Sequence, residues 1–259
     1  MVGEAMTTDP ANPNPNPNPV TGRSGHAVPG SREAIDDLLS QLHTGGWGLE
    51  AWVGLLVKAS QRSVDQARAR PQALLEVTAL HVLLGVCAGA PGWKWVMVTW
   101  SLAASHLGLL EGRKSLGPAN IITLMRANLP ALENSLGRWV PVLALISDFV
   151  DGKLARATGT ETSFGQYADF FADTALWTWF SMHYESSRTV RTATFTAWSL
   201  PVVLVAFVSF ARGRMIDVPR SWWFRPAAAV QVLLGARMIR RWLRSVHAGA
   251  ALMKACRSG

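Results

Sequence analysis

Polar and apolar positions divide the chain into a polar start and a series of apolar helical stretches. Residues 1–30 contain the run ANPNPNPNPV with scattered Gly, Ser and Thr, which cannot bury a core, so a disordered tail is expected. Farther on, apolar side chains recur at helical spacing until Gly45-Gly46 interrupts them, and a second helix is expected at 49–68. The interval 31–71 is therefore predicted to be a helical appendage, either cytoplasmic or lying at the membrane interface.

Long apolar stretches dominate the rest of the sequence. Two of them, 73–90 and 93–111, are separated by Pro91-Gly92, and each is near the length that crosses a bilayer. A further span is expected at about 192–211. Charged residues make up only 16% of the chain and the mean hydropathy is positive, which favours an integral membrane protein.

The last apolar stretch, 222–245, is ambiguous because arginines follow its apolar part. The positive-inside rule favours a cytoplasmic C-terminal tail, which argues against a complete crossing by this stretch. We therefore predict an all-α fold, a polytopic membrane helix bundle of six to seven spans. Its membrane-embedded core is expected at 72–245, and residues 246–259 are expected to form a tail.

Net charge and cysteine content exclude two other classes of protein. The formal net charge is +8, but the basic residues are spread among apolar segments and gather near the expected membrane ends. We interpret them as contacts to anionic lipid or phosphate, and we expect no nucleic-acid partner. The two cysteines, Cys87 and Cys256, form no framework, so a disulfide-rich fold is excluded.

Four aspartates in the middle of the chain carry the candidate chemistry. Asp148 and Asp151 are three positions apart, which places them on one face of a helix. Asp169 and Asp173 are four positions apart and share a face in the same way. Carboxylates in apolar helices are costly unless they are neutralised, and oxygen-only ligand sets suit Mg²⁺ or Mn²⁺. The pattern predicts a divalent metal site between the end of one helix and the start of the next.

The residues between these carboxylates suit a phosphate substrate. Gly152 directly follows Asp151 and would let a ligand approach the helix backbone. Arg156 supplies a planar fork of donors for a phosphate, and Gly165 would let the two helices pack closely.

This stretch resembles the signature of the CDP-alcohol phosphatidyltransferase family, D-x2-D-G-x2-A-R-x8-G-x3-D-x3-D. All eight fixed positions match, namely Asp148, Asp151, Gly152, Ala155, Arg156, Gly165, Asp169 and Asp173. A chance match at eight named positions has a probability on the order of 10⁻⁸, so the signature is specific although it covers a small part of the chain.

The resemblance implies transfer of a substituted phosphate, usually the phosphatidyl group of CDP-diacylglycerol, to an alcohol acceptor with release of CMP. It implies that the four aspartates hold two divalent ions, Mg²⁺ or Mn²⁺, and that Asp173 is also the general base. It places Gly152, Arg156 and Thr162 at the cytidine diphosphate of the donor. Membrane lipids are then expected partners, and a homodimer is left open.

A weaker motif precedes the signature. Asn120, Thr123 and Arg126 resemble the family's N-x2-T-x2-R entrance to its first core helix. This implies that Asn120 and Thr123 lie near the cytidine or the diphosphate. Too few residues separate Asn120 from Asp148 for two full spans and a turn, so the first core helix is expected to be short or steeply placed.

The alcohol acceptor cannot be identified from the sequence. A basic pocket beside the metals would suit a phosphorylated acceptor, and Arg126, Arg212 and Arg214 are candidates for it, with lipid anchoring as an equal alternative. Metal, donor and soluble acceptor are available in the cytoplasm, so the aspartates are expected to open to that side of the cell membrane. The alternative function is a non-catalytic membrane protein that keeps the fold and binds lipid or metal.

Overall fold

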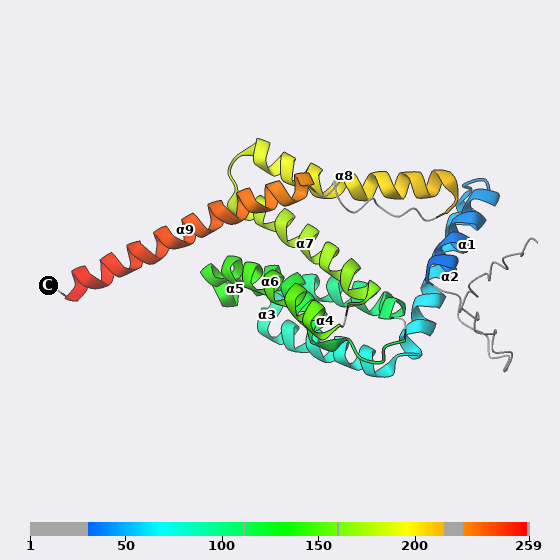
Figure 1. The fold of residues 1–259 in the computed structure, drawn as a ribbon, viewed down its shortest axis with the longest axis horizontal. Coiled ribbons are helices and arrows are strands. Elements are labelled where there is room, and N and C mark those ends of the chain that lie inside the picture. Colours follow the sequence, from blue (N-terminus) through cyan, green and yellow to red (C-terminus); the bar gives the residue numbers. More distant parts are fainter. Residues whose placement is uncertain (1–30, 111, 160, 215–224, 258–259) are drawn as a thin grey trace, which may run out of the picture.

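The computed structural model describes residues 31–110, 112–159, 161–214 and 225–257, so the predicted disordered tail lies outside the described residues. Within these ranges the regular structure is entirely helical, as predicted, and no strand occurs (Figure 1). The long helices are α1 Ser31–Thr44, α2 Leu49–Arg68, α3 Pro71–Ser105, α4 Gly117–Ala127, α6 Val140–Thr158, α7 Ser163–Tyr184, α8 Arg188–Arg212 and α9 Arg225–Arg257. Shorter turns of helix are η1 Leu107–Leu110, η2 Leu129–Leu132, α5 Glu133–Leu136 and η3 Gly137–Trp139.

Helices α1 and α2 form the predicted appendage and run across the direction of α8 (Figure 1). The chain reverses between them through Gly46 and Trp47, which have φ angles of 62° and 63°. The rings of Trp47 and Trp52 lie 6.0 Å and 5.7 Å from the ring of Phe210, near the end of α8. The appendage is therefore fixed to one end of α8 by aromatic contacts.

Helix α3 is a hairpin of two helical arms, 71–88 and 90–105. Gly89 has φ 64° and ψ −165°, outside the helical region, and Pro91 follows it, so the predicted break at this point is confirmed. The arms run antiparallel, because the indole Nε1 of Trp100 donates a hydrogen bond of 3.2 Å to the hydroxyl of Thr78.

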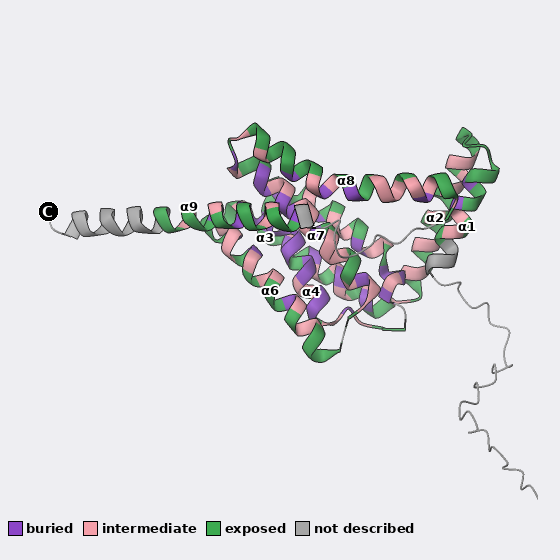
Figure 2. Ribbon diagram, turned by 45° about the horizontal axis from the view of Figure 1, so that its top comes forward, coloured by how far each residue is buried: buried purple, intermediate pink, exposed green. Residues whose placement is uncertain are grey.

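The helix that follows, α4, has only 11 residues, which confirms the prediction of a short first core helix. The chain is interrupted by η2, α5 and η3 before α6 begins, and Gly137 has a φ of 52° in this interruption. Helix α4 packs against both α6 and α7. Buried side chains gather where these three helices meet, whereas α8 is exposed along much of its length (Figure 2).

The predicted number of six to seven spans is not confirmed. Among the described residues, α3 and α8 are long and apolar enough to cross a membrane, although the break at Gly89 divides α3 into two shorter arms. Helix α4 is too short to cross, and α6 and α7 carry the aspartates between their middle and their facing ends. The exposed faces of α3 and α8 are rich in large apolar side chains, such as Val86 at 77% and Phe207 at 68% exposure, which suits contact with lipid.

Helix α9 differs from its prediction in length and in position. The helix continues to Arg257, so most of the predicted tail at 246–259 is helical. Arg237 on α9 forms an ion pair of 2.9 Å with Glu185, whose side chain is only 2% exposed. Glu185 precedes α8, and Arg212 ends that helix of 25 residues, so the two lie about 37 Å apart.

The position of α9 brings Arg237 and Arg241 beside Glu185 at the start of α8, whereas Arg212 lies at its end. The buried carboxylate of Glu185 needs a cation, and these two arginines supply it at 2.9 Å and 3.9 Å. This ion pair and the packing of Leu234 and Met238 in the apolar core hold α9 in place, and the cytoplasmic C-terminal tail stays a prediction.

Cysteine labelling tests this arrangement. With both native cysteines replaced by serine, single cysteines introduced as Ser186→Cys and Arg214→Cys should react with a membrane-impermeant maleimide from opposite sides, because the whole of α8 separates them. Leu243→Cys on α9 should be labelled from the same side as Ser186→Cys. Labelling of Ser186→Cys and Arg214→Cys from one side would show that α8 does not cross.

Candidate active site

The site lies where the C-terminal half of α6 faces the N-terminal half of α7. Helix α6 ends at Gly159, which has the left-handed φ of 59° that commonly follows a helix. Helix α7 begins after Thr162, whose hydroxyl accepts a hydrogen bond of 3.0 Å from the backbone N–H of Gly165. The predicted arrangement of helix end, polar turn and helix start is therefore confirmed.

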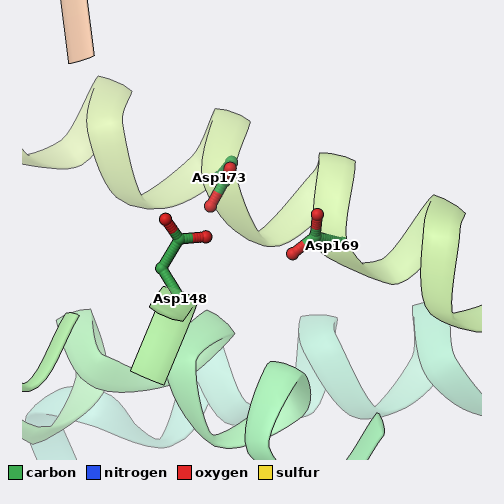
Figure 3. A group of neighbouring side chains, drawn as sticks. All are labelled: Asp148, Asp169 and Asp173. Carbon is green, nitrogen blue, oxygen red and sulfur yellow. The ribbon is translucent and has the colours of Figure 1, made fainter. Parts of the chain in front are cut away.

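Three of the four aspartates point toward one another across this interface. One carboxylate oxygen each from Asp148, Asp169 and Asp173 lies within 4.8 Å of the other two (Figure 3). The side chain of Asp169 is 49% exposed and that of Asp173 is 14% exposed, so the group is open on the Asp169 side.

Asp151 lies deeper and has partners of its own. Its Oδ2 accepts a hydrogen bond of 2.8 Å from the hydroxyl of Thr123 on α4, and its Oδ1 accepts one of 2.6 Å from the N–H of Gly152. The structure therefore places Thr123 beside a signature carboxylate.

Arg126 of α4 lies among all four aspartates. Its side chain has no exposed surface, and its Nη1 and Nη2 pair with Asp148 and Asp169. Its Nη2 also lies 3.4 Å from Asp151 Oδ2 and 3.5 Å from Asp173 Oδ1. The sequence predicted Arg126 in an acceptor pocket, and the spacing along the chain gave no sign of this position, which depends on how α4 packs.

Asn120 and Thr162 meet beside the start of α7. The side-chain amide of Asn120 donates to the backbone carbonyl of Leu116 at 2.7 Å and to the hydroxyl of Thr162 at 3.3 Å. A Cβ atom on Gly165 would lie 2.5 Å from Asn120 Oδ1 and 3.3 Å from Thr162 Oγ1. Only glycine at this position allows α7 to approach α4 so closely.

Gly152 and Arg156 form a second pair, one turn apart on α6. The guanidinium of Arg156 folds back over Gly152, where a Cβ atom would lie 3.4 Å from Nη1. Arg156 is exposed, so its donors can reach a ligand from solvent. A further arginine that the sequence reasoning missed, Arg113, donates to the backbone carbonyl of Gly159 at 3.1 Å and holds the end of α6.

The other two predicted acceptor residues lie elsewhere. Helix α8 ends at Arg212 against the appendage, where a Cβ atom on Gly213 would lie 3.6 Å from the Cβ of His43. No contact between the aspartates and Arg212 or Arg214 occurs among the described residues.

The donor set fits a divalent metal ion. Carboxylate oxygens are the ligands that Mg²⁺ and Mn²⁺ prefer, and opposite ligands of such an ion lie about 4 Å apart. The spacing of 4.8 Å or less within the group of three is close to this value. Asp173 Oδ1 is buried and accepts no hydrogen bond, so this oxygen is available to bind a metal ion.

A model of the CDP-alcohol phosphatidyltransferase family matches residues 116–255, more than half of the chain. The chain belongs to this family. The match begins at Leu116, directly before α4, and it includes every signature residue of the site. Searches of the curated proteins and of the solved structures found no match. Membership makes the chain a membrane enzyme of the class that transfers a phosphatidyl group from a CDP-alcohol, a class that uses divalent metals.

Substitution of Gly165 tests the close contact between α4 and α7. Gly165→Ala should lower the free energy of unfolding by about 1–3 kcal/mol, because the added methyl group overlaps Asn120 Oδ1. The control is Gly54→Ala in α2, where a Cβ atom meets nothing within 4 Å, and it should be neutral or slightly stabilising. Thermal unfolding in detergent measures both, and equal stability of the two variants would show that the contact is not tight.

Proposed function

We propose that the chain transfers the phosphatidyl group of CDP-diacylglycerol to an alcohol and releases CMP, as a step of phospholipid biosynthesis. The observation that carries this proposal is the convergence of all four signature carboxylates on one site between α4, α6 and α7. A non-catalytic protein that only binds lipid or metal is the alternative, and it leaves the complete set of four costly carboxylates unexplained.

Asp173 acts as the general base in this proposal. Its carboxylate takes the proton of the acceptor hydroxyl as the hydroxyl oxygen forms a bond to the phosphorus that carries diacylglycerol. The bond between that phosphorus and the bridging oxygen breaks, and CMP leaves with the bonding electrons. Asp173 suits this role because it is near the exposed Asp169 and has an oxygen that no hydrogen bond engages.

The four aspartates would hold two divalent ions, Mg²⁺ or Mn²⁺, next to the diphosphate of the donor. Bound ions would neutralise the charge that develops on the leaving CMP. Asp148, Asp169 and Asp173 are the residues whose oxygens lie closest together, and Asp151 is held in place by Thr123.

The donor is assigned to the face of α6 and α7 next to the aspartates. Arg156 would bind the diphosphate through two of its N–H groups, and the bare backbone of Gly152 leaves room for that approach. Asn120 and Thr162 would line the neighbouring position through their polar side chains, which already contact each other. Arg212 and Arg214 stay predictions for the acceptor, because no described contact links them to the site.

The site is assigned to the cytoplasmic side of the cell membrane. Donor and soluble acceptors are made in the cytoplasm, and the end of the molecule with Gly159 also carries Arg113 and Arg156. The appendage of α1 and α2 is at the end of α8 that carries Arg212, and we assign it to the membrane interface, where exposed apolar side chains such as Leu49 and Leu56 would enter the headgroup layer.

Incubation of purified protein with labelled CDP-diacylglycerol, Mg²⁺ or Mn²⁺ and a panel of alcohols tests the function directly. We expect metal-dependent release of CMP together with a labelled phospholipid, whose headgroup identifies the acceptor. Donor binding without CMP release for every acceptor would favour the non-catalytic alternative.

Asp173→Asn tests the general base. The change should lower the rate of CMP release by about 10²–10⁴-fold or more, because it removes both a proton acceptor and a metal ligand, while donor binding is kept. Asp65→Asn, the same substitution at an exposed aspartate of α2, is the control and should keep wild-type activity. An Asp173→Asn rate within about tenfold of wild type would place the base elsewhere.

Arg156→Lys tests the donor assignment. Lysine keeps the charge but presents a single ammonium group, so the apparent affinity for the CDP donor should fall measurably. Equilibrium binding of a CDP-linked donor at saturating Mn²⁺ measures the change. Unaltered affinity would identify Arg156 as a structural or lipid-anchoring residue.

A further inference from the structure

Arg126 has an environment that neither substrate binding nor general packing explains. Its side chain has no exposed surface, although a guanidinium strongly prefers water or a charged partner. It extends from the last turn of α4 and reaches carboxylates on both α6 and α7. It therefore lies underneath the site, where no acceptor molecule from solvent can meet it.

The guanidinium engages two of the residues that form the candidate metal site. Its Nη1 donates to Asp148 Oδ1 and its Nη2 donates to Asp169 Oδ1, two of the three residues that form the metal-type group. In contrast, Asp173 Oδ1 accepts no hydrogen bond. A divalent ion bound by all three residues would therefore lie next to the guanidinium and share two of its carboxylate partners with it.

Charge leads to the same conclusion. Carboxylates that converge on one site repel one another when they are ionised, and arginine stays protonated under all ordinary conditions. Arg126 supplies a positive charge within 3.5 Å of Asp151 and Asp173 and in direct contact with the other two. The arginine therefore stabilises the same arrangement of carboxylates that a metal ion would stabilise.

We propose that Arg126 is an internal counter-cation that holds the four carboxylates together before metal binds and that lowers their affinity for divalent ions. Metal binding is then an exchange, in which Asp148 and Asp169 weaken their ion pairs with the guanidinium and interact with the metal ion instead. This inference rests on the metal site of the proposed function but not on the donor, the acceptor or the reaction.

Titration with Mn²⁺ alone, in the absence of donor, tests the inference. Arg126→Gln should bind Mn²⁺ about tenfold or more tightly than wild type, because a competing unit charge a few ångströms from the ion is removed. The same variant should have a lower unfolding temperature without metal and a larger rise in that temperature on adding Mn²⁺. Arg68→Gln, at an exposed position of α2, is the control for overall charge and should match wild type.

A second variant covers the case in which Arg126→Gln does not fold. Arg126→Lys keeps the charge but cannot reach all four carboxylates with one ammonium group, so it should also bind Mn²⁺ more tightly than wild type. Equal or weaker Mn²⁺ binding by the folded variants would overturn the exchange. Absence of Mn²⁺ binding by wild type and variants alike would overturn the metal site itself, a result that is distinct from loss of the exchange alone.

Discussion

Repulsion among four converging carboxylates is opposed by the positive charge of one buried arginine, and the three core helices pack around these charges. The aspartates belong to α6 and α7, whereas Arg126 belongs to α4. Removing one partner of a buried ion pair costs about 3–5 kcal/mol, so these charges contribute to holding α4 against the other two helices, together with its apolar contacts. The charges that form the site therefore also help to hold the core helices together.

The α3 hairpin supports α4 on its other side. Asn128, which is fully buried directly after α4, accepts a hydrogen bond of 2.7 Å from the hydroxyl of Thr99 and donates one of 2.9 Å to the carbonyl of Leu124. The indole of Trp95 donates to the carbonyl of Ala127 at 2.8 Å. These bonds satisfy the last carbonyls of α4 and fix the turn that carries Arg126. The hairpin lies outside the family match, which begins at residue 116, and it supports the short core helix that the match includes.

The sequence was sufficient for the features that depend on local spacing. The aspartate pairs, Gly165 and the polar turn predicted a helical hairpin with converging carboxylates, and Gly45-Gly46 and Pro91-Gly92 predicted the two breaks near them. The sequence placed Arg126 beside the metal site as an acceptor residue, but its contacts with the aspartates could not be predicted, because they depend on the packing of α4 against two helices that come later in the chain. The predicted number of spans is not confirmed, because it counted each apolar stretch as a crossing and α4 has only 11 residues.

Charge rules for loops are weak in this chain. Arginines occur at both ends of α8, with Arg188 and Arg191 at its start and Arg212 at its end. A difference in basic residues between the two sides is then too small to orient the bundle. Arg237 does not count fully in this comparison of basic residues, because it neutralises the buried carboxylate of Glu185. Arginines that neutralise a buried acid are structural, so they carry little weight in a rule that concerns unpaired basic residues of loops.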